Sequence, residues 1–181
     1  MFSVFERYTD RIKKGTLHPN VELGKKLAIT TDQNDLIIDY QIITHEQDRD
    51  IVIDLADRVL SKHKVDSWSF DKVFWRKESK ELLQLEIPKV IMPKLGIRTE
   101  QEKLEEQSYS FNRLRNKHSA IESNINELEH RGLDRCRNKG YAHFKNYITL
   151  AVCAYNLKKI GRAILIAQRE KVQILNLSIA A

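Results

Sequence analysis

Two acidic residues in this 181-residue chain stand where a carboxylate could take part in catalysis. Asp71 ends a short strand-like segment, and Glu122 lies within a helical segment further along the chain. Carboxylate oxygens bind hard cations such as Mg²⁺. Two divalent ions about 3.5–4 Å apart can activate the attacking group and stabilise the leaving oxygen of a phosphodiester. The pair therefore predicts a two-metal site for nucleic-acid phosphates, where it would supply two of three converging carboxylates.

Basic residues flank both carboxylates. Contacts between such side chains and phosphates would give a salt-dependent affinity that does not depend on base sequence. The candidate DNA-binding residues are Lys72, Arg76, Lys77, Arg115, Lys117, His118, Arg135 and Arg137. A simpler interpretation is also open, because a strand-end Asp, a mid-helix Glu and a run of cations are often solvated surface residues. The clustering of cations beside both carboxylates favours the phosphate-directed function.

The composition agrees with an anionic partner. The chain has 31 Lys and Arg against 25 Asp and Glu, a formal net charge of +6 and a pI near 9.3. Excess positive charge favours nucleic acid, and 41% hydrophobic residues suffice for a folded core. No apolar run reaches the ~18 residues of a membrane helix, so we expect a cytoplasmic protein with no membrane partner.

Other kinds of catalytic site lack their residue patterns. Cys136 and Cys153 are isolated, which disfavours a zinc site and a disulfide and indicates a reducing compartment. No His-Glu-x-x-His helix and no glycine-rich phosphate loop is present. A Gly-x-Ser-x-Gly nucleophile elbow is also absent from the sequence. We therefore expect no small-molecule substrate.

The elements that must position Asp71 and Glu122 alternate between strands and helices. Strands are predicted over residues 25–31, 36–44, 65–71 and 90–92. Helices are predicted over residues 47–63, 76–85, 108–129 and 142–170. The first two strands should form an antiparallel hairpin, and Gly161 should interrupt the last helix. This order predicts a mixed α/β domain with a helical C-terminal part.

Glu122 lies beside an apolar stripe of its predicted helix. The stripe residues are Phe111, Leu114, Ile121, Ile125 and Leu128. Because Glu122 follows Ile121 directly, we expect it to face the sheet edge rather than open solvent.

Residues 93–107 differ from their surroundings in composition. They are rich in glutamate and poor in apolar side chains. We expect a solvated linker, an insertion or an exposed helix face rather than an acidic binding site. Residues 1–181 should otherwise form one domain, because a chain of this length suits a single core.

Over nearly its whole length the chain resembles the C-terminal, catalytic part of bacterial insertion-sequence transposases of the DDE type. The resemblance is carried by Phe2-Ser-Val-Phe-Glu-Arg-Tyr-Thr-Asp10, Val21-Glu-Leu-Gly24, Ser69-Phe-Asp-Lys72, Lys117-His-Ser-Ala-Ile-Glu-Ser123, His130-Arg-Gly-Leu-Asp-Arg-Cys136 and Phe144-Lys-Asn-Tyr147. The last three in succession are the most specific. The resemblance implies an RNase H-like core, a mixed sheet flanked by helices, with an Asp–Asp–Glu triad that binds two Mg²⁺ or Mn²⁺ ions. It makes Asp71 the second Asp and Glu122 the Glu.

The chain departs from the family pattern beside both of these residues. Val73 stands where related sequences usually carry Gly. His118 and Glu129 stand where many relatives carry Arg and Lys. Some subfamilies share these features, so the departures do not by themselves imply loss of function.

The first Asp of the triad belongs on a strand that precedes residues 25–31. Asp10 is the preferred candidate in this sequence, and Glu6 and Asp32 are alternatives. A further alternative is that the chain contains no counterpart. The resemblance also implies a preceding helix-turn-helix region, which is missing here, so the chain is expected to be truncated at its N-terminus.

Two functions follow from the resemblance. In the first, the chain is a transposase catalytic domain that cleaves DNA at the ends of an insertion sequence and transfers the strands to target DNA, with a homodimer as a possible assembly. In the second, it is a catalytically inactive remnant that binds DNA or the full-length transposase. A third interpretation, an unrelated helical scaffold, is supported by the long C-terminal helices alone and predicts no affinity for DNA.

Overall fold

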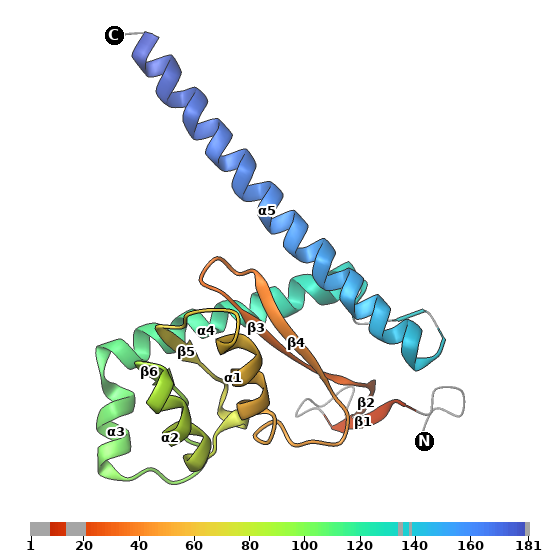
Figure 1. Ribbon diagram of the computed structural model, residues 1–181, viewed down its shortest axis with the longest axis vertical. Helices are drawn as coiled ribbons and strands as arrows, with labels where there is room; N and C mark the ends of the chain where they lie inside the picture. Colours follow the sequence, from red (N-terminus) through yellow and green to blue (C-terminus); the bar gives the residue numbers. More distant parts are fainter. Residues whose placement is uncertain (1–7, 14–20, 134–135, 138, 180–181) are drawn as a thin grey trace.

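The computed structural model describes residues 8–13, 21–133, 136–137 and 139–179. At residues 13, 22, 118–120, 131–132 and 174–179 it describes the backbone alone. Among these residues, four strands come first, helices and strands then alternate from α1 to β6, and a long C-terminal helix extends away from the rest (Figure 1).

Two antiparallel hairpins open the fold. β1 (Asp10–Lys13) pairs with β2 (Val21–Gly24). β3 (Lys26–Thr31) pairs with β4 (Ile37–Ile43), with a register shift at the last residue of β3. The predicted hairpin is therefore confirmed.

The turn between β3 and β4 is closed by acidic residues. The main-chain N–H of Asp32 donates to the Leu36 carbonyl at 2.9 Å. The Oδ1 atom of Asp32 accepts from the main-chain N–H groups of Asn34 and Leu36, at 2.8 and 2.9 Å. Asp35 adopts a φ of 62°, a left-handed conformation in which Asp and Asn are enriched. Short polar side chains thus shape this turn, as their composition predicts.

Helix α1 (Val52–Leu60) packs through one apolar face. Its buried residues are Val52, Leu55, Ala56 and Val59. This i, i+3, i+4, i+7 spacing is that of an amphipathic helix. The helix begins at Val52 rather than at the predicted Gln47: residues 48–50 form a turn instead, closed by a hydrogen bond from the Asp50 N–H to the Gln47 carbonyl at 2.8 Å.

A parallel strand pair follows. β5 (Ser67–Ser69) pairs with β6 (Lys89–Ile91), and helix α2 (Lys77–Glu86) connects them. The core around this unit consists of Val52, Ala56, Phe70, Leu83, Ile87, Val90 and Met92. Parallel strands joined by a helix form a βαβ unit, whose strand ends are a common place for ligand sites.

Half of the glutamate-rich segment forms helix α3 (Glu100–Gln107). Thr99 caps it, and the Glu102 side chain bonds back to the Thr99 N–H, which completes a capping box. Ion pairs hold the segment together and to α2: Lys94–Glu102 at 2.8 Å, Arg98–Glu106 at 2.7 Å and Lys80–Glu105 at 2.8 Å. Its acidic side chains are thus mainly structural partners of nearby cations.

Two long helices complete the chain. The Ser108 hydroxyl caps α4 (Tyr109–Leu128), and a π-helical turn follows at Glu129–Leu133. Helix α5 (Tyr141–Ile179) is nine residues longer at its C-terminus than predicted and continues through Gly161 without interruption. The core shared by the hairpin and both helices consists of Ile37, Leu128, Ile148, Val152 and Tyr155.

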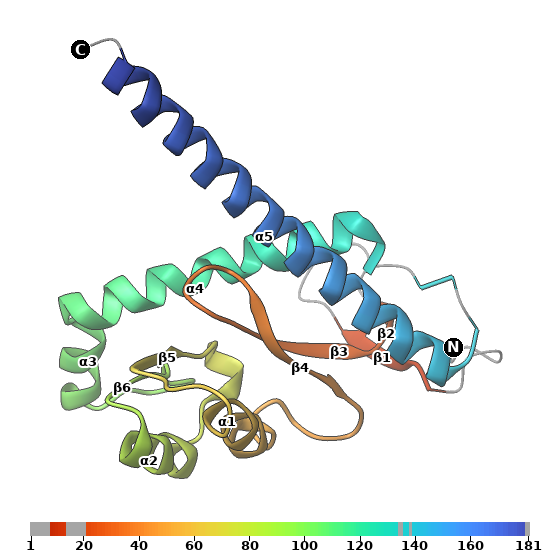
Figure 2. The same ribbon diagram turned by 45° about the horizontal axis from the view of Figure 1, so that its top comes forward.

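The predicted mixed α/β class is confirmed. Among the described residues, however, the strands form three separate two-stranded sheets rather than one mixed sheet. Helix α4 lies along the βαβ unit and the β3–β4 hairpin. Helix α5 crosses α4 and extends past it (Figure 2). Within the same residues, no helix combines the length and the hydropathy that a membrane span requires.

Candidate active site

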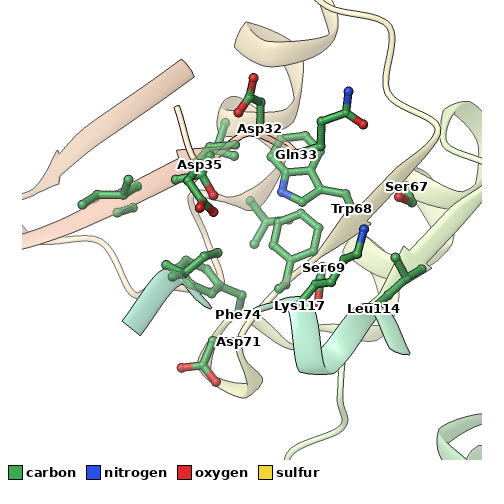
Figure 3. A pocket seen from close by; sticks show the side chains of 18 residues that line it. Asp32, Gln33, Asp35, Ser67, Trp68, Ser69, Asp71, Phe74, Leu114 and Lys117 are labelled. Carbon is green, nitrogen blue, oxygen red and sulfur yellow. The ribbon is translucent and has the colours of Figure 1, made fainter. Parts of the chain in front are cut away.

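A cavity of about 370 Å³ lies between the β3–β4 turn, the end of β5 and one face of α4 (Figure 3). Part of its wall is aromatic: the rings of Trp68 and Phe70 stack with centroids 5.0 Å apart, and Phe74 is tilted against Phe70. The polar residues of the lining are Thr30, Thr31, Asp32, Gln33, Asp35, Ser67, Ser69, Asp71 and Lys117. The cavity thus combines an aromatic wall with polar groups that can orient a ligand, as ligand sites commonly do.

Asp71 stands on the wall of this cavity. The preceding residue, Phe70, extends the parallel pairing by donating its N–H to the Ile91 carbonyl at 2.8 Å. Asp71 then caps the 3₁₀ turn Lys72–Phe74, and its Oδ1 accepts from the Lys72 N–H at 2.6 Å. Its side chain is exposed. The strand-end position predicted for Asp71 is thus found at the carboxyl end of a parallel strand, where open α/β sheets gather ligands.

Glu122 lies next to the cavity but is not among the residues that line it. Helix α4 presents Leu114, Lys117 and Ile121 to the cavity. Glu122 is one residue further, about 100° around the helix, and its side chain is exposed. Rather than facing the sheet edge, the carboxylate occupies the flank of α4, beside the cavity.

The preferred first carboxylate, Asp10, lies elsewhere. It begins β1, and its Oδ2 accepts from the Lys25 Nζ at 2.7 Å. It lines a second hollow, with residues of β1 and of the loop that follows β4. That hollow is at the end of the hairpin where β3 begins, whereas the cavity with Asp71 is at the end where β3 turns into β4. The structure does not bring Asp10 and Asp71 together.

Of the two alternatives, Asp32 shares the cavity with Asp71, and Glu6 lies outside the described residues. Figure 3 shows the side chains of Asp32, Asp35 and Asp71 around the same opening. Asp32 already accepts two main-chain hydrogen bonds within its turn. It is nevertheless the candidate first carboxylate that the structure places on the wall shared with Asp71.

The candidate DNA-binding residues have different surroundings. Lys117 lines the cavity and extends over Ser69 towards Trp68 (Figure 3). Arg76 pairs with Asp50 at 2.8 Å, and Lys77 pairs loosely with Glu81 at 3.8 Å. The side chains of Lys72, Arg115 and Arg137 are exposed. Arg135 and the side chain of His118 lie outside the structural description.

One polar atom in the wall is unusual. The Ser69 Oγ is buried and has no hydrogen-bond partner among the described atoms. A buried hydroxyl without a partner is costly unless water or a ligand satisfies it. Ser69 is therefore a donor that could bind a polar group held in the cavity.

The residues that hold the acidic turn in place could not be identified from the sequence alone. The Asn156 side chain of α5 bonds both main-chain groups of Ile37, accepting from its N–H and donating to its carbonyl, each at 2.9 Å. Asp35 receives a hydrogen bond from Asn124 at 3.4 Å and lies 3.6 Å from the Lys159 Nζ. Polar residues on otherwise apolar helix faces were the only available signal for these contacts.

Electrostatics reinforce this anchor. Burial raises the pKa of the Tyr155 hydroxyl, an effect that neighbouring Lys159 opposes. Burial alone would lower the pKa of Lys159, but Tyr155, Asp35 and Glu127 together raise it. Lys159 therefore remains a cation beneath the turn, where it fixes Asp35.

A family model described as the transposase DDE domain matches residues 8–157. The chain belongs to this family. The match includes every residue that lines the cavity, so the cavity is part of the transposase DDE domain itself. The resemblance predicted from the sequence is thereby confirmed. A search of curated proteins and a search of solved structures found no match.

Transposase DDE domains generally depend on divalent metal ions and act on DNA. The donor chemistry of Asp71 and Glu122 suits such ions, because both present carboxylate oxygens. Their arrangement is incomplete, however: within the described part of the chain, no three His, Cys, Asp or Glu side chains converge as a metal centre. The described residues alone therefore do not form the three-carboxylate site that the resemblance implies.

Proposed function

We propose that this chain is the catalytic part of an insertion-sequence transposase, which cleaves DNA at the ends of the element and transfers the strands to target DNA. The observation that carries the proposal is the position of Asp71, at the end of a parallel strand and on a cavity wall shared with α4, the helix of Glu122. Membership of the family agrees with it.

In this proposal, Asp71 and Glu122 are the carboxylates that hold Mg²⁺ or Mn²⁺. Asp32 is the better placed of the described candidates for the third carboxylate, because it lines the same cavity as Asp71. Asp10 is less suited, since its carboxylate already pairs with Lys25. The bound ions would supply charge stabilisation at the phosphate.

We also infer that the hairpin and the βαβ unit correspond to the two parts of an RNase H-like sheet. The order of the described elements supports this inference: an antiparallel hairpin, a helix, a strand, a helix and a further parallel strand. The exposed cations Lys72, Arg115 and Lys117 would contact DNA phosphates beside the carboxylates.

Nicking of supercoiled plasmid in Mg²⁺ or Mn²⁺ tests the catalytic proposal. Asp71→Asn and Glu122→Gln should each lower the nicking rate at least about 100-fold, the order of effect expected when one transition-state contact is removed. Asp66→Asn and Glu86→Gln are matched controls, because both residues are exposed and neither lines the cavity. Full nicking by the Asp71 or Glu122 variant would refute the assignment.

A second function is favoured by a different observation. Asp10 and Asp32 are both engaged in structural contacts, one with Lys25 and the other within its turn. A chain whose first carboxylate is committed in this way would bind DNA, or another transposase subunit, without cleaving it. Salt-dependent plasmid binding without nicking in either metal would establish this function instead of catalysis.

A further inference from the structure

Three side chains from three different elements meet beside the acidic turn. Asp35 belongs to the turn between β3 and β4, Asn124 to α4 and Lys159 to α5. The Asn124 amide donates to the Asp35 Oδ1 at 3.4 Å and accepts from the Lys159 Nζ at 3.3 Å. The same Nζ lies 3.6 Å from the Asp35 Oδ2. These contacts close a triangle of Asp35, Asn124 and Lys159, which we call the turn bracket.

The turn bracket is largely shielded from solvent on the side of the helices. Asn124 is 5% exposed, and the side chain of Lys159 is 21% exposed. The Lys159 ammonium also lies 5.3 Å from the centre of the Tyr155 ring, and Tyr155 is fully buried. Hydrogen bonds to a charged group are stronger than neutral ones, and loss of one partner leaves buried polar groups unsatisfied. The bracket therefore helps to hold the turn, α4 and α5 in one arrangement.

Through Asp35, the bracket also holds Asp32. The Asp35 N–H donates to the Asp32 carbonyl at 3.2 Å, and the Asp32 N–H donates to the Leu36 carbonyl at 2.9 Å. The Leu36 N–H in turn donates to the Asp32 Oδ1 at 2.9 Å. Because these bonds close the turn on itself, a displacement of Asp35 would displace the Asp32 carboxylate as well.

On α4, the bracket continues the face that lines the cavity. This face is a row with spacings of three and four residues, which consists of Leu114, Lys117, Ile121 and Asn124. Glu122 lies about 100° around the helix from Ile121. Its distance from the cavity therefore depends on the rotation of α4 about its own axis, and the contact of Asn124 with the turn fixes that rotation.

Lys159 connects these two effects from outside the cavity. It does not line the cavity, and it lies beyond residues 8–157, which the family model matches. We propose that Lys159 is a positioning residue, which through Asn124 and Asp35 fixes the turn of Asp32 against α4, the helix of Glu122. The importance of this contact for catalysis rests on the proposed function, whereas the contact itself can be tested without it.

The neighbouring residue provides a matched control. Lys158 pairs with Glu127, so it also joins α5 to α4, but neither residue belongs to the turn. The side chains of Lys158 and Lys159 are similarly exposed, by 25% and 21%. Lys158→Met and Lys159→Met each remove one positive charge and one ion pair of α5. Any effect of net charge or of helix packing should thus be similar in both variants, and only Lys159→Met removes the bracket.

Amide hydrogen exchange of the full chain, measured by NMR, tests the contact directly. The N–H groups of Asp35 and Leu36 close the turn, so their exchange reports its opening. Lys159→Met should accelerate this exchange at least about 10-fold, and Lys158→Met less than about twofold. Lys159→Arg should remain close to the wild-type chain, because a guanidinium keeps the charge and the donors. Equal acceleration in the two methionine variants would overturn the proposal.

Plasmid nicking tests the consequence for catalysis. Lys159→Met should lower the maximal nicking rate at least about 10-fold relative to Lys158→Met, because misplaced reacting groups slow the chemical step. The affinity for plasmid should be the same in both variants, and Lys159→Arg should restore most of the rate. Equal nicking by the two methionine variants would overturn the proposal and leave the proposed function intact. A wild-type chain that does not nick would overturn the proposed function, and the exchange rates would then decide whether Lys159 holds the turn.

Discussion

The two ends of the β3–β4 hairpin carry acidic residues in different surroundings. At the turn, Asp32 and Asp35 line the cavity that also contains Asp71. At the opposite end, Asp10 pairs with Lys25, whose side chain is 4% exposed. Both ends are thus acidic, but only the acids of the turn lie beside the other candidate catalytic residue. Residue type thus identifies the candidate carboxylates, whereas the direction of the hairpin decides which of them lie close enough to act together.

Replacing the acids at the two ends of the hairpin, one at a time, should give the largest difference, and plasmid nicking measures it. Asp32→Asn should lower plasmid nicking at least about 100-fold, whereas Asp10→Asn should lower it far less. Asn can replace Asp within the turn, because its side-chain oxygen still accepts the two main-chain hydrogen bonds. A loss of nicking in the Asp32 variant would therefore reflect lost charge rather than a lost turn.

The opposite result would exchange the roles proposed for the two ends of the hairpin. If Asp10→Asn abolished nicking while Asp32→Asn retained it, the end of the hairpin at β1 would be the catalytic one. Thermal unfolding of both variants is the necessary control, because a fall in nicking that follows a fall in stability identifies no catalytic group.

Removing the Asn156 side chain, which anchors the turn end of the hairpin, should have the next largest effect, a loss of stability. Asn156→Ala leaves the N–H and carbonyl groups of Ile37 without their partner, and Ile37 is 5% exposed. Each unsatisfied buried group costs about 1–3 kcal/mol, so urea unfolding should show a loss of about 2–4 kcal/mol. Asn146→Ala is the control, since Asn146 is exposed on the same helix. Equal stability of the two variants would show that α5 does not anchor the turn.

The sequence was informative where local rules decide the structure. Alternating apolar residues and the acidic turn predicted the hairpin, and helical spacing predicted α1, α2 and α4. The sequence was less informative where polar and charged side chains determine the structure. Helix α3 depends on its Thr99–Glu102 capping box and on ion pairs rather than on an apolar face. For the site, Asp71 could be placed at a strand end from its own segment. The separation of Asp10 from Asp71 could not be predicted from the sequence, because a contact such as the Lys25–Asp10 ion pair depends on tertiary structure.

The ion pair at the other end of the hairpin should give a smaller effect on stability. Asp10→Asn removes the negative charge that pairs with the buried Lys25 ammonium and leaves it with neutral acceptors, such as the Thr44 carbonyl at 3.5 Å. Removing one member of a fully buried pair costs 3–5 kcal/mol. Asp10 is 40% exposed, so a loss of about 1–2 kcal/mol is expected in urea unfolding. Lys25→Met combined with Asp10→Asn should recover part of this loss, and no recovery would show that the buried charge is not its cause.

The smallest effect concerns the loop after β4, beside Asp10. Hydrogen bonds from its own N–H and from the N–H groups of Thr44 and His45 lower the pKa of Glu46 from 4.5 to about 2. Because the folded pKa is depressed, the stabilisation is present above pH 4.5 and is lost as the pH falls towards 2. Amide exchange at Thr44 and His45 should therefore accelerate over this interval in the wild-type chain. In Glu46→Gln the exchange rates, corrected for the intrinsic effect of pH, should be flat across the interval. The same acceleration in that variant would show that another group causes the acid sensitivity of the loop. The two ends of the hairpin would then differ only in whether their acidic side chains lie beside Asp71.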